Sequence, residues 1–135
     1  MSKKALIIIN PCSGTRRANK YLTDIVDIFT TADYVCTVLT TTKRGDGTLY
    51  AKKYASKMDL ITAIGGDGTF NEVVSGVIQS GHRVPIGYIP AGSTNDFASS
   101  LEIPKNILAA ARDVVNGEPV SFDVGSFNGR NFSYV

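Results

Sequence analysis

Short apolar runs alternate with one-sided helical patterns from residue 4 to residue 117. The first run, residues 5–9, is apolar throughout, as expected of a strand buried on both faces of a parallel sheet. Apolar residues then recur at i, i+3, i+4 and i+7, which predicts a helix over about 17–31. Strands in this order are parallel and joined by right-handed crossovers. The sequence therefore predicts an α/β fold in three layers, a mostly parallel sheet with helices on both of its faces.

The later elements follow the same alternation. Further strands are predicted at 34–40, 60–64 and 85–89, with helices after residue 46, over 70–78 and, as a short helix, over 96–101. Asp46 is interpreted as the cap of the second helix. Pro104 suits the first position of the last helix, which Asn116 and Gly117 end.

The alternation stops after residue 119. Residues 120–127 are strand-like, and Asn128-Gly129 has the chemistry of a two-residue hairpin turn. We therefore expect residues 1–119 to form one α/β domain. We expect residues 120–135 to begin a hairpin that leads to a second, mainly β domain absent from this chain.

Composition is that of an ordinary globular domain. The chain has 135 residues, enough for one sizeable core, and no apolar run approaches the roughly 18 residues of a membrane span. The first four residues lead directly into a strand, so no signal peptide is expected. Cys12 and Cys36 do not make a disulfide framework, which favours a reducing cytoplasm.

The net charge of +2 is unevenly distributed. Residues 1–57 hold ten Lys/Arg and four Asp, whereas residues 58–135 hold four Lys/Arg and eight Asp/Glu. The basic half could meet phosphates or the anionic inner face of a membrane as a peripheral contact. The alternative is that these charges are solvated helix faces.

Residues 61–74 join an apolar strand to a helix through Gly65-Gly66-Asp67-Gly68-Thr69. Glycines let a ligand approach the backbone, and the amides of such a turn and of a helix start bind anions. Asp67 would repel phosphate unless a cation lay between them, so its position indicates Mg²⁺. At Gly66 we expect a positive φ, and we expect Gly66→Val to cost more function than fold.

A purely structural reading of the same stretch stays open. Glycine turns join strands to helices where no ligand binds. Thr69 and Glu72 have the spacing of a capping box, which would occupy the Glu72 carboxylate at the start of its own helix.

Four loops are predicted to meet at one edge of the sheet. Ligands of parallel sheets bind at the carboxyl ends of the strands. Residues 10–14, 41–45, 65–68 and 90–95 all follow predicted strands, so all four should line that edge. A nucleophilic pair of Cys12 and His82 is not expected there, because His82 falls at the far end of a helix.

Three motifs resemble those of one family. N-P-C-S-G at 10–14 resembles the lipid-kinase loop N-P-x-S-G, and G-G-D-G-T at 65–69, followed by N-E, resembles the family's nucleotide loop. Residues 90–98 resemble P-x-G-T-x-N-D-F-A, with Ser93 where Thr is common, and D-V-G at 123–125 matches a D-x-G stretch. Together they resemble the N-terminal domain of diacylglycerol-kinase and sphingosine-kinase-type lipid kinases. NAD kinase and phosphofructokinase share only the central loop.

The resemblance implies a set of ATP-binding residues and a metal site. The ATP-binding positions are Asn10, Pro11, Cys12, Ser13, Gly14, Thr41, Gly65, Gly66, Asp67, Gly68, Thr69, Asn71, Glu72 and Ser93. Either Thr40 or Thr41 could hold the position after the second strand. The resemblance also implies that Asp67, Asp96 and Asp123 surround Mg²⁺, directly or through water.

The implied reaction is transfer of the ATP γ-phosphoryl group to a lipid hydroxyl, diacylglycerol being the first candidate. A sphingosine- or ceramide-like lipid, NAD, and a nucleotide-binding module without turnover remain alternatives. In the family the catalytic base and the lipid pocket lie in a second domain, here beyond Val135, so this chain is expected to bind ATP and transfer nothing. No nucleic acid partner is expected, and a homo-oligomer stays open.

Overall fold

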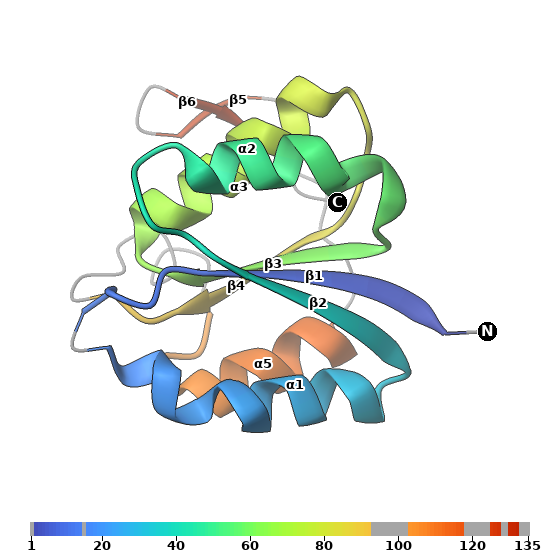
Figure 1. The fold of residues 1–135 in the computed structure, drawn as a ribbon, viewed down its shortest axis with the longest axis vertical. Helices are drawn as coiled ribbons and strands as arrows, with labels where there is room; N and C mark the ends of the chain where they lie inside the picture. Colours follow the sequence, from blue (N-terminus) through green and yellow to red (C-terminus); the bar gives the residue numbers. More distant parts are fainter. Residues whose placement is uncertain (1, 15, 93–102, 118–124, 128–129, 133–135) are drawn as a thin grey trace.

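The computed structural model describes residues 2–14, 16–92, 103–117, 125–127 and 130–132. Its centre is a parallel sheet of four strands in the order β2 (Tyr34–Thr40), β1 (Lys3–Ile9), β3 (Leu60–Gly65) and β4 (Ile86–Pro90). Helices cover both faces, which gives three layers (Figure 1). The predicted α/β fold is confirmed.

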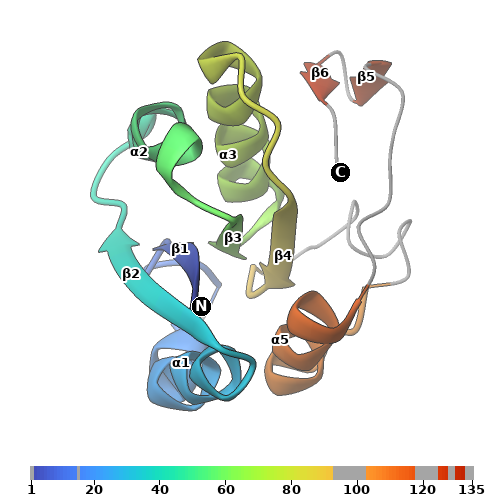
Figure 2. The ribbon, with the colours of Figure 1, turned by 90° about the vertical axis from the view of Figure 1, so that its right-hand side faces the viewer.

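Among the described residues, two α-helices lie on each face of the sheet. α2 (Asp46–Tyr54) and α3 (Asp67–Ser80) cover one face, and α1 (Leu22–Thr31) and α5 (Ile107–Asn116) cover the other (Figures 1 and 2). Two short 3-10 helices, η1 (Arg17–Tyr21) and η2 (Ala55–Lys57), precede α1 and follow α2. None of the described helices is long and apolar enough to cross a membrane.

The apolar runs explain the two cores. Along β1, Leu6 and Ile8 pack under α2 and α3, whereas Ile7 and Ile9 pack under α1 and α5. Successive side chains of a strand point to opposite faces, so a strand covered on both sides is apolar throughout. All five residues of 5–9 are buried.

Several helix starts differ from the expectations. The single helix predicted over 17–31 is divided into η1 and α1. Pro104 is not the first position of α5: Asn106 is its cap, and the Asn106 side chain accepts a hydrogen bond of 2.9 Å from the Ala109 amide. A side-chain acceptor at the N-cap satisfies a helix amide, which Pro104 cannot do. The predicted end of α5 at Asn116-Gly117 is correct.

A small antiparallel pair, β5 (Gly125–Phe127) and β6 (Arg130–Phe132), lies beside α3 (Figure 2). Phe127 is opposite Arg130, the register of a two-residue connection. This pairing agrees with the hairpin predicted around residues 128–129. Those two residues, the predicted short helix over 96–101 and residues 120–124 lie outside the described part of the chain.

Candidate functional site

An open cavity of about 630 Å³ lies at the carboxyl ends of β1, β2 and β3. Three of the four loops expected at this edge line it, and the residues are Asn10, Pro11, Cys12, Ser13, Thr41, Thr42, Lys43, Arg44, Gly66, Gly68, Thr69 and Glu72. The Asn10 amide donates to Ile64 O and the Thr41 amide to Ile9 O, each at 2.9 Å, so both loops leave the sheet from paired positions. The predicted convergence is confirmed for these loops.

The fourth loop is described only to Gly92. The Ala91 amide donates to Gly65 O at 2.8 Å, and a Cβ atom built on Gly66 would lie 3.6 Å from Gly92 Cα. This loop therefore starts against the glycine turn. Ser93 falls outside the described residues, as do Asp96 and Asp123.

The first loop is a preformed turn. Asn10 Oδ1 accepts a 3.0 Å hydrogen bond from the Cys12 amide, and the Ser13 amide donates to Asn10 O at 3.2 Å. Such an Asx turn holds its own backbone without a ligand. Gly14 has a φ of 55° and does not line the cavity. Asn10 thus shapes the loop that borders the cavity.

In the glycine turn, the crowded residue is Gly65. A Cβ atom on Gly65 would lie 2.6 Å from Thr69 Oγ1 and 3.0 Å from Ser13 Oγ, so only glycine lets these two loops approach. Gly66 has a φ of −87° and a ψ of −175°, and the expected positive φ is wrong. Extended backbone is open to any residue, so close packing selects glycine at 65 and sterics do not demand it at 66.

Glu72 does not cap its own helix. Its Oε1 accepts a 3.0 Å hydrogen bond from the Gly47 amide, and its Oε2 a 3.2 Å bond from the Gly45 amide, both at the start of α2. The capping-box interpretation is therefore wrong. The first amides of a helix lack acceptors within that helix, and here the Glu72 carboxylate of α3 is the acceptor for those at the start of α2.

Asp46 also acts differently from the expected helix cap. Its Oδ2 accepts hydrogen bonds from the Thr42 amide, the Thr42 hydroxyl and the Lys43 amide, at 2.8, 3.0 and 3.1 Å. The backbone bond from Thr42 is the largest of the effects that lower the pKa of Asp46. Asp46 therefore fixes the preceding loop, while Glu72 caps the helix.

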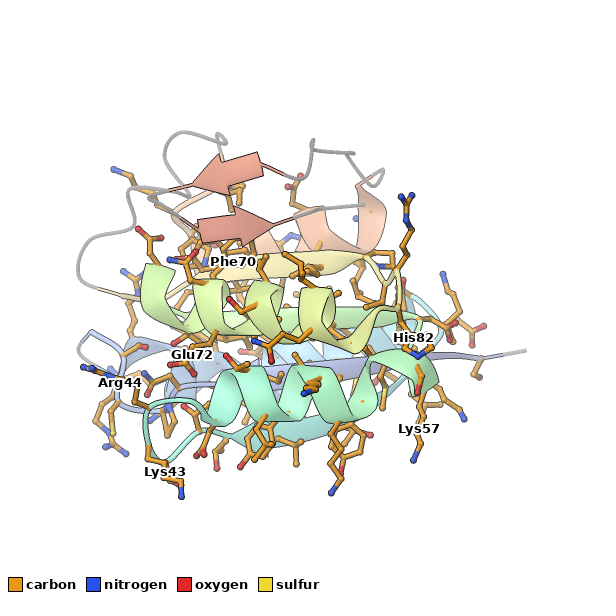
Figure 3. The ribbon with its side chains drawn as sticks, turned by 90° about the horizontal axis from the view of Figure 1, so that it is seen from above. Lys43, Arg44, Lys57, Phe70, Glu72 and His82 are labelled. Atoms are coloured by element: carbon orange, nitrogen blue, oxygen red, sulfur yellow. The ribbon has the colours of Figure 1, made fainter. Side chains whose placement is uncertain are left out.

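Lys43 and Arg44 are cavity residues that sequence reasoning did not single out. Both are exposed and stand at the tip of the loop tied down by Asp46 and Glu72 (Figure 3). The signal that could have identified them from sequence is a basic pair directly after a predicted strand. Thr41, not Thr40, lines the cavity, and the Thr40 carbonyl accepts a bond from Tyr50 Oη instead.

Asp67 lies at the first position of α3 but does not line the cavity. Its Oδ1 accepts a 2.7 Å hydrogen bond from Tyr88 Oη on β4. Tyr88 also stacks on Phe70, with ring centroids 4.5 Å apart and planes 11° apart. Asn71 is half-buried and does not line the cavity either.

Helical geometry places Glu72 on a different side of α3 from Phe70, the residue that stacks on the Tyr88 partner of Asp67. Phe70 and Glu72 are two positions apart, about 200° around a helix. Figure 3 shows Phe70 on the side of α3 toward β5 and β6, and Glu72 on the side toward α2. Within the described residues no group of three or more His, Cys, Asp or Glu could hold a metal ion. His82 lies past the far end of α3, so the structure agrees that it does not pair with Cys12 (Figure 3).

The parallel sheet, the glycine turn at a helix start and the cavity with two cations define an α/β domain suited to an anionic ligand at its strand ends. Residues 4–127 match the family model described as diacylglycerol kinase catalytic domain. The chain belongs to this family, as its motifs indicated.

Individual relatives agree with the family. The chain is 46% identical over 132 residues to a diacylglycerol kinase of Bacillus subtilis (strain 168), and covers 96% of itself and 44% of that protein. It is 38% identical over 133 residues to a diacylglycerol kinase of Staphylococcus epidermidis (strain ATCC 12228 / FDA PCI 1200), covering 98% of itself and 42% of that protein. The chain thus spans less than half the length of these relatives.

A solved structure shows the same fold. The crystal structure of a diacylglycerol kinase from Bacillus anthracis str. Sterne superposes with a TM-score of 0.84 at 37% identity. The match covers 96% of this chain and 48% of that one.

Proposed function

We propose that this chain is the ATP-binding part of a diacylglycerol-kinase-like lipid kinase, which transfers the γ-phosphoryl group of ATP to a lipid hydroxyl. The observation that carries the proposal is the cavity itself. It joins a glycine turn, a helix start and two exposed cations, Lys43 and Arg44, at the carboxyl edge of a parallel sheet. Family membership supplies the reaction class.

The cavity accounts for most of the proposed ATP contacts. Its nine proposed contact residues are Asn10, Pro11, Cys12, Ser13, Thr41, Gly66, Gly68, Thr69 and Glu72. Gly66 and Gly68 expose backbone at the start of α3, where amides and the helix dipole favour phosphate oxygens. Lys43 and Arg44, which also line the cavity, add positive charge. Gly65 acts indirectly, because it lets the first loop close onto Thr69.

Asp67 fits a magnesium site in its chemistry. Mg²⁺ is usually held by one or two carboxylates together with substrate phosphates and water. Asp67 offers a half-buried carboxylate at the helix start beside the glycine turn. We propose that Asp96 and Asp123 complete this site. The bound ion would neutralise charge on the phosphate oxygens during transfer.

Phosphoryl transfer is mainly a problem of position and charge. In this chain the loops orient the phosphates, and Lys43 and Arg44 offset their charge. The attacking hydroxyl also needs a group that orients or deprotonates it. Glu72, which lines the cavity, is engaged by two amides and is a poor candidate. We therefore propose that the base and the lipid pocket belong to a second domain beyond residue 135.

Binding and transfer assays test this proposal separately. Calorimetry of the chain with Mg-ATP should show binding, and Asp67→Asn should weaken its magnesium dependence. Radiolabelled ATP with diacylglycerol in mixed micelles should yield no phosphatidic acid from this chain alone, and NAD serves as a second acceptor. An absence of ATP binding would contradict the proposed function, and lipid phosphorylation by this chain would contradict the need for a second domain.

A further inference from the structure

The Tyr88 side chain reaches the Asp67 carboxylate from a different element of the fold. Its hydroxyl donates to Asp67 Oδ1 at 2.7 Å, the short distance of a charge-assisted bond. Tyr88 lies on β4 and Asp67 opens α3, so the bond joins a strand of the sheet to the glycine turn. The sequence motif around Asp67 does not predict Tyr88 as a partner.

The phenol is held rigidly. Tyr88 is 2% exposed, and its ring stacks on Phe70, which is three residues after Asp67 on the same helix. The oxygen of Tyr88 therefore has a fixed position relative to the first turn of α3. A phenol has an ordinary pKa of about 10, so at neutral pH the Tyr88 hydroxyl keeps its proton and remains a donor to Asp67.

A carboxylate at a helix start needs such a constraint. The terminal torsion of an aspartate is broad, so its two oxygens rotate easily when no partner holds them. The positive end of the helix dipole also attracts it. A donor fixed by β4 and Phe70 selects one orientation of the Asp67 carboxylate, and that orientation is set before any ligand arrives.

We propose that Tyr88 is a positioning residue: it holds the Asp67 carboxylate in the orientation that serves the magnesium ion of the bound nucleotide. The inference rests on the proposed function, because it assigns a partner to the proposed metal residue. Partners one shell away from a metal orient its ligands, and their loss costs roughly 10- to 100-fold in metal affinity. Phe70 supports the same residue through the stacked ring.

The test measures ATP affinity of the whole chain with Mg²⁺ and with EDTA. Tyr88→Phe removes one oxygen and keeps the stacked ring. We expect the Kd for Mg-ATP to rise roughly tenfold, while the Kd for ATP in EDTA stays unchanged. Tyr34→Phe is the matched control, because Tyr34 lies at the far end of β2 and packs on Phe29. It should change neither affinity.

If the Tyr88 hydroxyl only stabilised the fold, Tyr88→Phe would weaken the affinity for Mg-ATP and the affinity for ATP in EDTA together. That result would overturn the proposal. So would an unchanged Mg-ATP affinity in Tyr88→Phe. The effect must also act through Asp67, so in the Asp67→Asn background Tyr88→Phe should cause no further loss. If Tyr88→Phe does not fold, Phe70→Leu, which loosens the ring but keeps the hydroxyl, should produce a smaller loss confined to Mg-ATP.

Carbon-13 NMR of the Asp67 carboxylate separates this inference from the proposed function. Tyr88→Phe should shift that signal and Tyr34→Phe should not, and Mg²⁺ should shift it in the parent. If the parent binds no ATP, the proposed function fails, while the NMR result still decides whether Tyr88 sets the state of the Asp67 carboxylate. A carboxylate signal that ignores either Tyr88→Phe or Mg²⁺ would overturn the inference.

Discussion

The two sides of the first turns of α3 use their carboxylates in opposite ways. On the cavity side, Glu72 is engaged by the Gly45 and Gly47 amides and binds α2 to α3. On the β4 side, Asp67 receives a phenol held by a stacked ring. The first arrangement stabilises the wall of a site, and the second presents a charged group. This division between structure and function can be tested by substitution on each side.

The largest loss of folding stability is expected where α3 packs closely on α2. A Cβ atom on Gly76 would collide with the carbonyl oxygen of Thr48 and press on Ala51 of α2. Gly76→Ala should therefore destabilise the fold by about 3 kcal/mol, the upper part of the range for overpacking. Urea unfolding measures this cost. Gly68→Ala is the control, because no atom of the described residues lies within 4 Å of its Cβ position, and it should not destabilise the fold.

Removing the Glu72 carboxylate should cost stability, whereas neutralising Asp67 should not. Glu72→Ala leaves two amides of the α2 start without their acceptor, for a loss of about 2 kcal/mol. Glu72→Gln keeps one acceptor oxygen and should lose less. Asp67→Asn keeps an acceptor for Tyr88 and should unfold at nearly the parent urea concentration. Equal losses in Glu72→Ala and Asp67→Asn would contradict the division.

Two substitutions in the glycine turn should separate an effect on folding stability from an effect on ATP affinity. Gly65→Ala pushes against Thr69 and Ser13 and should destabilise by about 1–2 kcal/mol. Among the described residues, a Cβ atom on Gly66 meets only Gly92 Cα, at the ordinary contact distance of 3.6 Å, and Gly66 sits in extended backbone, so Gly66→Val should fold. Its branched side chain should still weaken ATP binding, roughly tenfold for about 1.4 kcal/mol of lost contact. Unchanged ATP affinity in folded Gly66→Val would show that this turn does not approach the nucleotide.

We expect low pH to destabilise the fold through Asp46, by less than the substitutions described above. Hydrogen bonds from Thr42 and Lys43 place the pKa of folded Asp46 below its ordinary value of 3.8. Its stabilising contribution is therefore complete above that ordinary value and is lost as the pH falls through the lower, folded value. Urea midpoints between pH 5 and pH 2 should fall less steeply in Asp46→Asn. A parent and variant with parallel profiles would contradict this role.

Sequence patterns predicted the fold because their signals are local. Continuous apolar runs mark buried parallel strands, helical spacing marks the covering helices, and the chirality of crossovers places all strand ends at one edge. The positions of Asn10, Thr41 and Gly66 at one cavity follow from those rules. The motifs, which are short and continuous, indicated the family for the same reason.

The capping-box error came from partners that are distant in sequence. The spacing of Thr69 and Glu72 is that of a capping box, yet Glu72 binds amides 25 and 27 residues earlier. Asp46 resembled a cap but holds the loop before it. For Glu72, the packing of α2 on α3 brings the amides of the α2 start within reach. For Asp46, the choice lies between two local roles, and its partners are only four and three residues earlier.

The sequence by itself therefore determined the α/β fold, the family and the set of loops that meet at the strand ends, since periodicity and crossover handedness are properties of short segments. Only the tertiary structure decided what Asp67 and Glu72 do. Tyr88 meets Asp67 across 21 residues, and Gly45 meets Glu72 across 27. Hydrogen bonds form at about 3 Å, and a chain reaches that distance between remote residues only after its helices and strands have packed.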